Sequence, residues 1–207
     1  KFWLKIILRN AARLIANSEF TKNEILKLGV RDDIEIKYPC ISRHGESYSQ
    51  ILKNLRIGLI KKHNLEGKKI ILSVGRLVAR KGFDKVIEAM PRVLREVPES
   101  IYVIVGNGPH KNNLLSERSR GGKLLENRVI FIDDLSDEEL GAWYSICDVF
   151  AMPARQIGSD VEGFGIVFLE AMYFARPCIG AYAGALPEVI SNNETGFLIK
   201  SDDVNDL

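Results

Sequence analysis

Two carboxylates, Glu162 and Glu170, stand on either side of a Gly-x-Gly turn that leads into a helical pattern. Glu162 falls in a loop whose glycines allow a ligand to approach the backbone closely. Glu170 lies inside the following helix, whose unpaired first N–H groups attract a diphosphate. Because a carboxylate accepts hydrogen bonds from paired sugar or ribose hydroxyls, the segment has the outline of a sugar-nucleotide site. The ordinary alternative is a solvated acidic pair around a turn.

Two cations, Arg76 and Lys81, flank a short loop directly after an apolar run. There they could clasp a pyrophosphate, the arginine through two hydrogen bonds and the lysine as a point charge. The alternative is ordinary surface charge, shared with Arg80 and Lys85 around a helix start. Cations at a helix N-terminus oppose the helix dipole, so a bound anion better explains their placement.

A second glycine loop, Gly106-Asn-Gly-Pro109, departs from the dinucleotide fingerprint because Lys111 occupies the third glycine position. This departure disfavours an NAD site. The plainer interpretation is a tight turn between a strand and a helix.

The elements that must position these residues alternate between short apolar runs and helical periods. This alternation predicts an α/β fold with a doubly wound, Rossmann-like parallel sheet. Ligands bind such sheets at the carboxyl ends of the strands, where the glycine loops fall, so we expect these loops to line one crevice. The expected strands are 70–74, 101–105, 129–132, 149–152 and 177–180, and the expected helices are 83–96, 111–120, 137–146 and 166–174.

The composition of the 207 residues, 46% hydrophobic and 27% charged with a net charge of +2, predicts a soluble globular protein without a nucleic-acid partner. Three widely spaced cysteines predict neither a disulfide framework nor a metal site, and indicate a reducing cytoplasm. No apolar run reaches the length of a membrane span. These cysteines are Cys40, Cys147 and Cys178.

The first residues read as a basic amphipathic helix, with Lys1, Lys5, Arg9 and Arg13 beside an apolar stripe. We expect the stripe to pack on a sheet; the alternative is peripheral contact with the inner membrane face. A strand at 14–17, a helix begun by Ser18 or Thr21 and ended by Gly29, and a strand at 34–38 follow. A polar helix is expected from about Glu46 to 61–64, and the capped start of another at 202–207. Because the chain starts and stops within such patterns, we expect a piece of a longer protein.

The motifs, in their order, resemble the retaining glycosyltransferases of the GT-B fold, family 4. The resemblance covers the chain from about Lys69 onward and, more weakly, 12–41. It implies that residues 1–45 are the tail of an N-terminal acceptor domain with its linker, and that 46–207 form the C-terminal donor domain, truncated at its end. The motifs are 75–82, 106–109, 162–170, 183–188 and 195–197.

The resemblance also implies roles for individual residues. Arg76, Lys81 and Glu162 would be catalytic, with Glu162 contacting sugar hydroxyls, whereas Glu170 would bind the ribose. The base would contact the loop around Leu135 and Asp137, where Asp133 or Asp134 replaces a common glycine. The further donor-binding residues implied are Gly75, Gly106, Phe164, Gly165, Ile166 and Val167.

The segment 152–162 is longer than the usual link and looks like the insertion of phosphatidylinositol mannoside mannosyltransferases. Within it we expect Asp160 to cap the loop rather than act in catalysis. Ala175, Ala183 and Cys147 also depart from the family pattern without removing a functional group. GDP-mannose is therefore the preferred donor and UDP-sugars come next.

The expected function is transfer of a sugar, with retention, to a lipid-linked or saccharide acceptor, without a metal or cofactor. The lack of an Asp-x-Asp triplet supports metal independence. Transfer by this chain alone is expected to be weak or absent. The alternatives are a non-catalytic nucleotide-binding or assembly module, a nucleotide-sugar epimerase, and a phosphorylase-like enzyme. Trp143 and Tyr144 are expected to pack a helix on the sheet rather than stack on a base.

Overall fold

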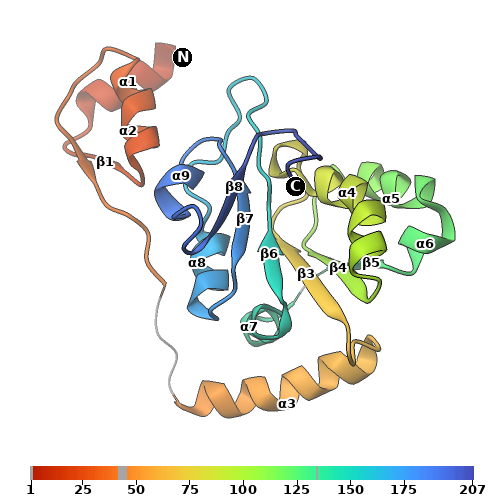
Figure 1. The fold of residues 1–207 in the computed structure, drawn as a ribbon. Helices are drawn as coiled ribbons and strands as arrows, with labels where there is room; N and C mark the ends of the chain where they lie inside the picture. The colour runs from red at the N-terminus through yellow and green to blue at the C-terminus, as the bar shows by residue number, and fades with distance from the viewer. Residues whose placement is uncertain (1, 42–45, 134) are drawn as a thin grey trace.

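The computed structural model describes residues 2–41, 46–133 and 135–207, which form a large unit and a small one (Figure 1). The large unit is built on a six-stranded sheet in which every neighbouring pair is parallel, in the order β5-β4-β3-β6-β7-β8. The predicted α/β doubly wound parallel sheet is therefore confirmed. Its strands are β3 (Lys69–Val74), β4 (Ser100–Val105), β5 (Val129–Ile132), β6 (Val149–Ala151), β7 (Cys178–Ala181) and β8 (Gly196–Ile199).

The strand order places the ligand crevice. From β3 the chain moves outward to β4 and β5, then crosses back to β6 on the other side of β3. The loops after β3 and β6 therefore leave the sheet in diverging directions, and at such a point of a parallel sheet a ligand crevice is expected at the carboxyl ends of the strands. The loops carrying Gly75 and Met152 flank this crevice.

Helices cover the sheet and bury a continuous core. In Figure 1, α3 and α7 lie below the sheet, α4, α5 and α6 lie to the right, and α8 and α9 lie to the left. The core includes the whole of β4 and the fully buried Trp143 and Phe150. These helices are α3 (Glu46–Lys62), α4 (Phe83–Glu96), α5 (Lys111–Arg120), α6 (Gly122–Glu126), α7 (Asp137–Ile146), α8 (Ile166–Tyr173) and α9 (Leu186–Val189), with the short 3-10 helix η1 (Ala79–Lys81) before α4.

The small unit pairs β1 (Leu14–Ala16) with β2 (Ile34–Ile36) in parallel, beside α1 (Phe2–Asn10) and α2 (Glu19–Leu26). Ser18 caps α2 by accepting a hydrogen bond from the Thr21 N–H, as one of the two predicted caps. The helix ends ahead of the predicted Gly29, which adopts a left-handed φ of 65° in the turn that follows.

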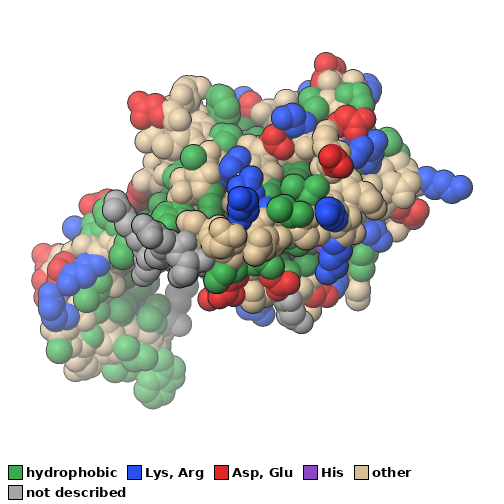
Figure 2. Space-filling model, turned by 90° about the horizontal axis from the view of Figure 1, so that it is seen from below, with side chains coloured by type: hydrophobic (Ala, Val, Ile, Leu, Met, Phe, Trp, Pro, Cys, Tyr) green, Lys and Arg blue, Asp and Glu red, His purple; other side chains and the backbone are tan. Residues whose placement is uncertain are grey.

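The prediction that the apolar stripe of α1 packs on a sheet is wrong for most of the stripe. No residue of α1 is buried, and Phe2 and Trp3 are 72% and 75% exposed. The buried hydrophobic cluster of the small unit consists of Leu14, Ala16 and Ile34, with Leu8 among the partly buried residues against it, so two strands offer too little surface to cover the helix. Figure 2 shows hydrophobic side chains gathered along the lower edge of this unit.

Several local predictions need correction. The helix expected at 202–207 is a series of turns, because Asp203 and Asp206 accept hydrogen bonds from nearby backbone N–H groups instead of leaving them to a helix. The short elements α6, α9 and β8 were not predicted.

Other local predictions are confirmed: helices α4, α5 and α7 and strand β5 have the predicted bounds. The linker residue Ser42 and the candidate glycine replacement Asp134 lie outside the described residues.

Candidate functional site

Two glycine loops meet at the carboxyl edge of the sheet. Gly75 follows β3 with φ 145° and Gly106 follows β4 with φ 132°, and a Cβ on Gly106 would lie 2.1 Å from the Gly75 carbonyl oxygen. The Leu77 N–H donates to the Asn107 carbonyl, and the His110 N–H donates back to the Leu77 carbonyl. The 106–110 segment is therefore a tight turn that supports the cation-bearing loop, as predicted, and its backbone contact leaves no room for a side chain.

A buried ion cluster spans the crevice from that loop to the loop before α8. Lys81 and Glu162 are 8% and 7% exposed, and Lys81 Nζ lies 2.6 Å from Glu162 Oε2. The Arg80 guanidinium reaches the same oxygen at 2.7 Å and Asp160 at 2.8 Å. The structure thus brings together Lys81 and Glu162, which the sequence placed in separate motifs.

Charge balance decides the ionisation of Glu162. Burial opposes the charged form, but the positive charges and hydrogen bonds of Lys81 and Arg80 outweigh it, so the pKa of the Glu162 carboxyl is lowered from 4.5. The glutamate is therefore a fixed acceptor aimed at two cations. The surface-charge alternative fails for Lys81 and Arg80, whereas Lys85 forms an ordinary partly exposed pair with Glu88.

Asp160 has a different task from the one predicted. Its backbone closes a turn with Ile157 through two hydrogen bonds, but its carboxylate pairs with Arg80 rather than capping the loop. Arg155 joins the same segment to Asp84 of α4 at 2.9 Å. The predicted insertion is thus held against the cation-bearing loop by ion pairs, which the sequence analysis missed.

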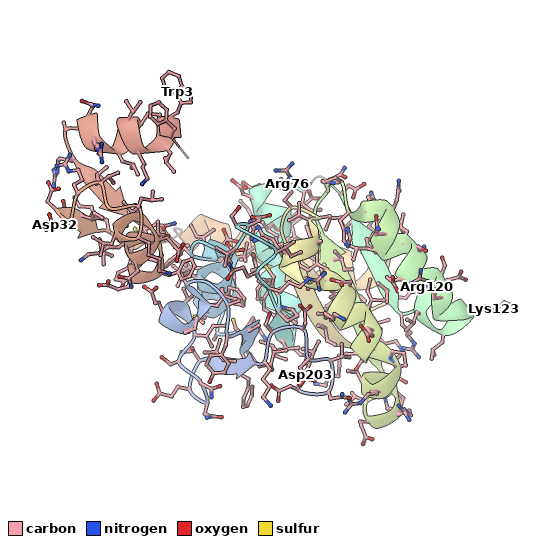
Figure 3. The ribbon with its side chains drawn as sticks, turned by 90° about the horizontal axis from the view of Figure 1, so that it is seen from above. Trp3, Asp32, Arg76, Arg120, Lys123 and Asp203 are labelled. Carbon is pink, nitrogen blue, oxygen red and sulfur yellow. The ribbon has the colours of Figure 1, made fainter. Side chains whose placement is uncertain are left out.

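Arg76 is exposed, unlike Lys81, and has no ion-pair partner among the described residues. It extends outward at the edge of the molecule in Figure 3. Its guanidinium is therefore free to bind an anion from solvent, whereas Lys81 must exchange or share its contact with Glu162 to do so. The Lys81 side chain itself passes over Gly75, where an added Cβ would lie 3.7 Å from Lys81 Cε.

Helix α8 starts at the crevice. Gly165 is its N-cap with φ 85°, and a Cβ there would lie 2.9 Å from both Leu186 and Phe168. Phe164 is buried and its ring contacts that of Tyr38. The first N–H groups of the helix, which belong to Ile166 and Val167, have no partner within the helix, as at any helix start.

The second carboxylate has a partner of its own. Tyr144 of α7, 2% exposed, donates its hydroxyl to Glu170 Oε2 at 2.7 Å. Both Trp143 and Tyr144 are buried, and Tyr144 packs on Phe150 of β6 as predicted, whereas the ring of Trp143 contacts His63 just after α3. The contact of Tyr144 with Glu170 was missed. The available signal was general: a buried tyrosine hydroxyl needs a partner, and a nearby carboxylate is a suitable one.

The predicted base-contact loop precedes α7. Ser136 and Glu139 form a capping box at the start of this helix. On either side of Ser136, Leu135 is partly buried against the core and Asp137 is exposed. Asp133 pairs with Lys111 of α5, which fastens the loop to its neighbour.

The small unit touches the Glu162 loop directly. Ser18 Oγ donates to the Gly163 carbonyl at 2.9 Å, while Glu188 accepts the first two N–H groups of α2, each at 2.7 Å. The Ala185 N–H donates to the Glu162 carbonyl at 3.1 Å. A carboxylate at a helix N-terminus is favoured by the helix dipole, so Glu188 links the two units. Sequence reasoning found the Glu188 motif but not this role.

Within the described ranges, no three His, Cys, Asp or Glu side chains converge where they could hold a metal ion. The expectation of a metal-independent reaction stays a prediction. Among the described helices, none combines the length and apolar character needed to cross a bilayer.

Comparison with known proteins gives a family and a fold. Residues 56–207 match the family described as glycosyl transferases group 1. Over 152 residues the chain is 36% identical to a GDP-mannose-dependent alpha-(1-6)-phosphatidylinositol monomannoside mannosyltransferase of Mycolicibacterium smegmatis, covering 72% of this chain and 39% of that protein. It is 34% identical over 143 residues to the sulfoquinovosyl transferase SQD2 of Arabidopsis thaliana, covering 67% of this chain and 25% of that protein.

Among solved structures, Anabaena Alr3699/HepE in complex with UDP and glucose superposes with a TM-score of 0.81 at 24% identity. The match covers 99% of this chain and 54% of that protein, and at this identity it shows a shared fold. The chain thus spans about half of this structure and less of the two sequence relatives.

Proposed function

Because the chain belongs to the glycosyl transferases group 1 family, we propose that it is the nucleotide-sugar-binding half of an enzyme that transfers a sugar to an acceptor hydroxyl. The observation that carries the proposal is the buried contact of Lys81 with Glu162 at the crevice beside β3 and β6. It supports the proposal because a cation suited to a diphosphate lies beside a carboxylate suited to sugar hydroxyls. A nucleotide-sugar joins a sugar to a diphosphate, so the two side chains match its two parts.

The chemistry asked of this half is stabilisation of a leaving nucleoside diphosphate. Arg76 and Lys81 approach the phosphates from one loop, and the start of α8 offers backbone N–H groups from the other side. Glu162 accepts hydrogen bonds from the sugar and orients it. Since these cations neutralise the developing charge, the reaction needs no metal, and we propose that it retains the anomeric configuration.

We propose GDP-mannose as the donor. Two features support it: the segment 152–162, expected from its resemblance to mannosyltransferases, and a relative at 36% identity that is named as GDP-mannose-dependent. A UDP-sugar, which the sequence analysis ranks next, is the alternative that the test below must exclude.

We further propose the division of the chain at residue 45, with 1–45 as the tail of the acceptor domain and its linker and 46–207 as the donor domain. The acceptor is then a lipid-linked or saccharide hydroxyl bound mainly by parts of the enzyme beyond this chain. Alone, the chain binds the donor and transfers weakly or not at all, because closure of two domains completes such sites. A cytoplasmic location stays a prediction, and peripheral contact with the inner membrane face stays the alternative given for the first helix.

The test is calorimetric titration of the 207-residue chain with GDP, UDP, ADP and GDP-mannose, with a chelator present. We expect GDP and GDP-mannose to bind, and Arg76→Ala and Glu170→Ala each to weaken binding about tenfold or more, since each removes charge-assisted hydrogen bonds. Arg120→Ala is the matched control. Arg120, at the end of α5, is also exposed, but it lies far from Arg76 (Figure 3).

Selective binding of UDP would show that the donor is a UDP-sugar instead of GDP-mannose, and the proposed class of enzyme would stand. Absence of binding to all four ligands would reject the proposal and favour the non-catalytic module. Binding that depends on added Mg²⁺ would reject the metal-independent reaction.

A further inference from the structure

We infer that Tyr144 is a positioning residue for the donor ribose, acting through Glu170. The inference rests on the proposed function and goes beyond it, since it assigns a task to a side chain that does not itself touch the nucleotide. It follows from one short contact between a buried hydroxyl and a partly exposed carboxylate.

The tyrosine is rigidly placed. Its ring lies parallel to that of Phe174, with centroids 6.1 Å apart and an interplanar angle of 10°, and it packs against Phe150 at 5.8 Å. Such packing leaves the hydroxyl a single direction, toward Glu170 Oε2 at 2.7 Å. The hydroxyl that donates to Glu170 is therefore fixed before any ligand arrives.

The contact uses only half of the carboxylate. A carboxylate offers about four lone-pair positions on its two oxygens, so with Oε2 held by the tyrosine, Oε1 still has its capacity to accept ribose hydroxyls. An untethered glutamate side chain would lose rotamer freedom when a ribose bound. The hydrogen bond removes part of that cost in advance, which is how a fixed binding group gains affinity.

The hydroxyl is suited to permanent donation. Burial, and then the negative charge and hydrogen bond of Glu170, raise the pKa of Tyr144 well above its ordinary value. It therefore keeps its proton at any physiological pH. A tyrosinate would repel the carboxylate, so a raised pKa keeps the contact intact.

The competing explanation is that Glu170 merely satisfies a buried hydroxyl for the sake of the core. The chain supplies a comparison for this case. Tyr102 is 0% exposed, and its hydroxyl shares a 2.8 Å hydrogen bond with Ser73 inside the sheet, away from the carboxylate. Removing either hydroxyl should disturb the core similarly, but only Tyr144 should affect ribose binding.

The experiment titrates the 207-residue chain, Tyr144→Phe and Tyr102→Phe with GDP and with 2′,3′-dideoxy-GDP. Tyr144→Phe should weaken GDP binding about five- to tenfold, less than the loss of a whole hydrogen bond to a charged group because Glu170 itself remains, and should leave dideoxy-GDP binding within about twofold of the unsubstituted chain. Tyr102→Phe should leave the affinity for both ligands unchanged. Adding Tyr144→Phe to Glu170→Ala should produce no further loss.

Three results would overturn the inference: equal weakening of both ligands by Tyr144→Phe, no weakening of either, or a loss with Tyr102→Phe as large as that with Tyr144→Phe. These results are distinct from failure of the proposed function. That failure would show as an unsubstituted chain that binds none of GDP, UDP, ADP and GDP-mannose; if the chain binds UDP instead of GDP, the same variants are titrated with UDP and 2′,3′-dideoxy-UDP.

Discussion

Replacing Lys81 with methionine tests the central claim that a buried ion pair holds the crevice. Lys81 Nζ lies 2.6 Å from Glu162 Oε2, and both residues are nearly inaccessible. Methionine keeps most of the length and volume of the lysine stem, so the change removes the charge with little loss of packing.

The magnitude follows from the partner that remains. Removing one member of a buried pair costs about 3–5 kcal/mol when the other charge is left alone. Here Arg80 still donates to the same oxygen at 2.7 Å, so Glu162 loses one of two charge-assisted bonds. Such a bond is worth about 1.5–3 kcal/mol. We therefore expect Lys81→Met to lower the free energy of unfolding by about 2 kcal/mol.

The assay is urea unfolding followed by the fluorescence of Trp143. This tryptophan is fully buried in α7 and reports on the large unit, whereas Trp3 is exposed on α1 and changes little. The midpoint should fall with the slope unchanged, because the surface exposed on unfolding stays the same. Lys85→Met is the matched control: its pair with Glu88 is partly exposed, so we expect a loss below about 0.5 kcal/mol.

A second substitution makes the reasoning refutable. Glu162→Gln in the Lys81→Met background removes the carboxylate charge that had lost one of its two partners. The double variant should therefore lose about 1–3 kcal/mol less stability than the sum of the two single losses. Strict additivity, or a Lys81→Met variant as stable as the unsubstituted protein, would show that the two side chains are not an energetically coupled buried pair.

Four further outcomes are expected. The pKa of Glu162 is lowered from 4.5, so the stability that its charge contributes is full above that pH and is lost as the pH falls through the folded-state pKa. Acidification below about pH 4.5 should therefore lower the free energy of unfolding, measured in urea, more for the unsubstituted protein than for Glu162→Gln. Gly184→Ala should lower stability by about 2–4 kcal/mol in thermal melts, because φ is 57° and the new Cβ would lie 2.1 Å from a carbonyl oxygen, whereas Gly58→Ala, in open space on α3, should raise it by about 0.5–1 kcal/mol. Glu188→Gln should speed hydrogen exchange at the first two amides of α2 and leave β3 unchanged, since a neutral amide offers those N–H groups one oxygen instead of two. A thiol reagent should modify Cys40 alone in the folded protein and all three cysteines after unfolding, because the other two are buried with their pKa raised to about 12.

Local sequence determined the elements. The bounds of α4, α5, α7 and β5 follow from apolar periodicity and from end signals such as the Ser136 capping box, which act between residues a few positions apart. The alternation of apolar runs with helical periods likewise indicated the parallel sheet, and the order of the glycine, cation and carboxylate motifs indicated the family. Such features need no knowledge of distant contacts.

Tertiary structure decided which side chains meet. Arg80 and Glu162 are far apart in the chain, as are Tyr144 and Glu170 and the pair formed by Ser18 and the Gly163 loop, and no periodicity links their positions.

Only the return of the chain from β5 to β6 brings the Lys81 loop and the Glu162 loop to one crevice. The exposed apolar stripe of α1 shows the limit of local sequence. Its amphipathic pattern predicts a helix with an apolar face, but burial of that face depends on the surface packed against it, and the two-stranded sheet supplies too little surface. Sequence alone specifies local backbone preference because the interactions that set it act between residues a few positions apart. Burial, ion pairing and site geometry depend on contacts that exist only once the chain has folded.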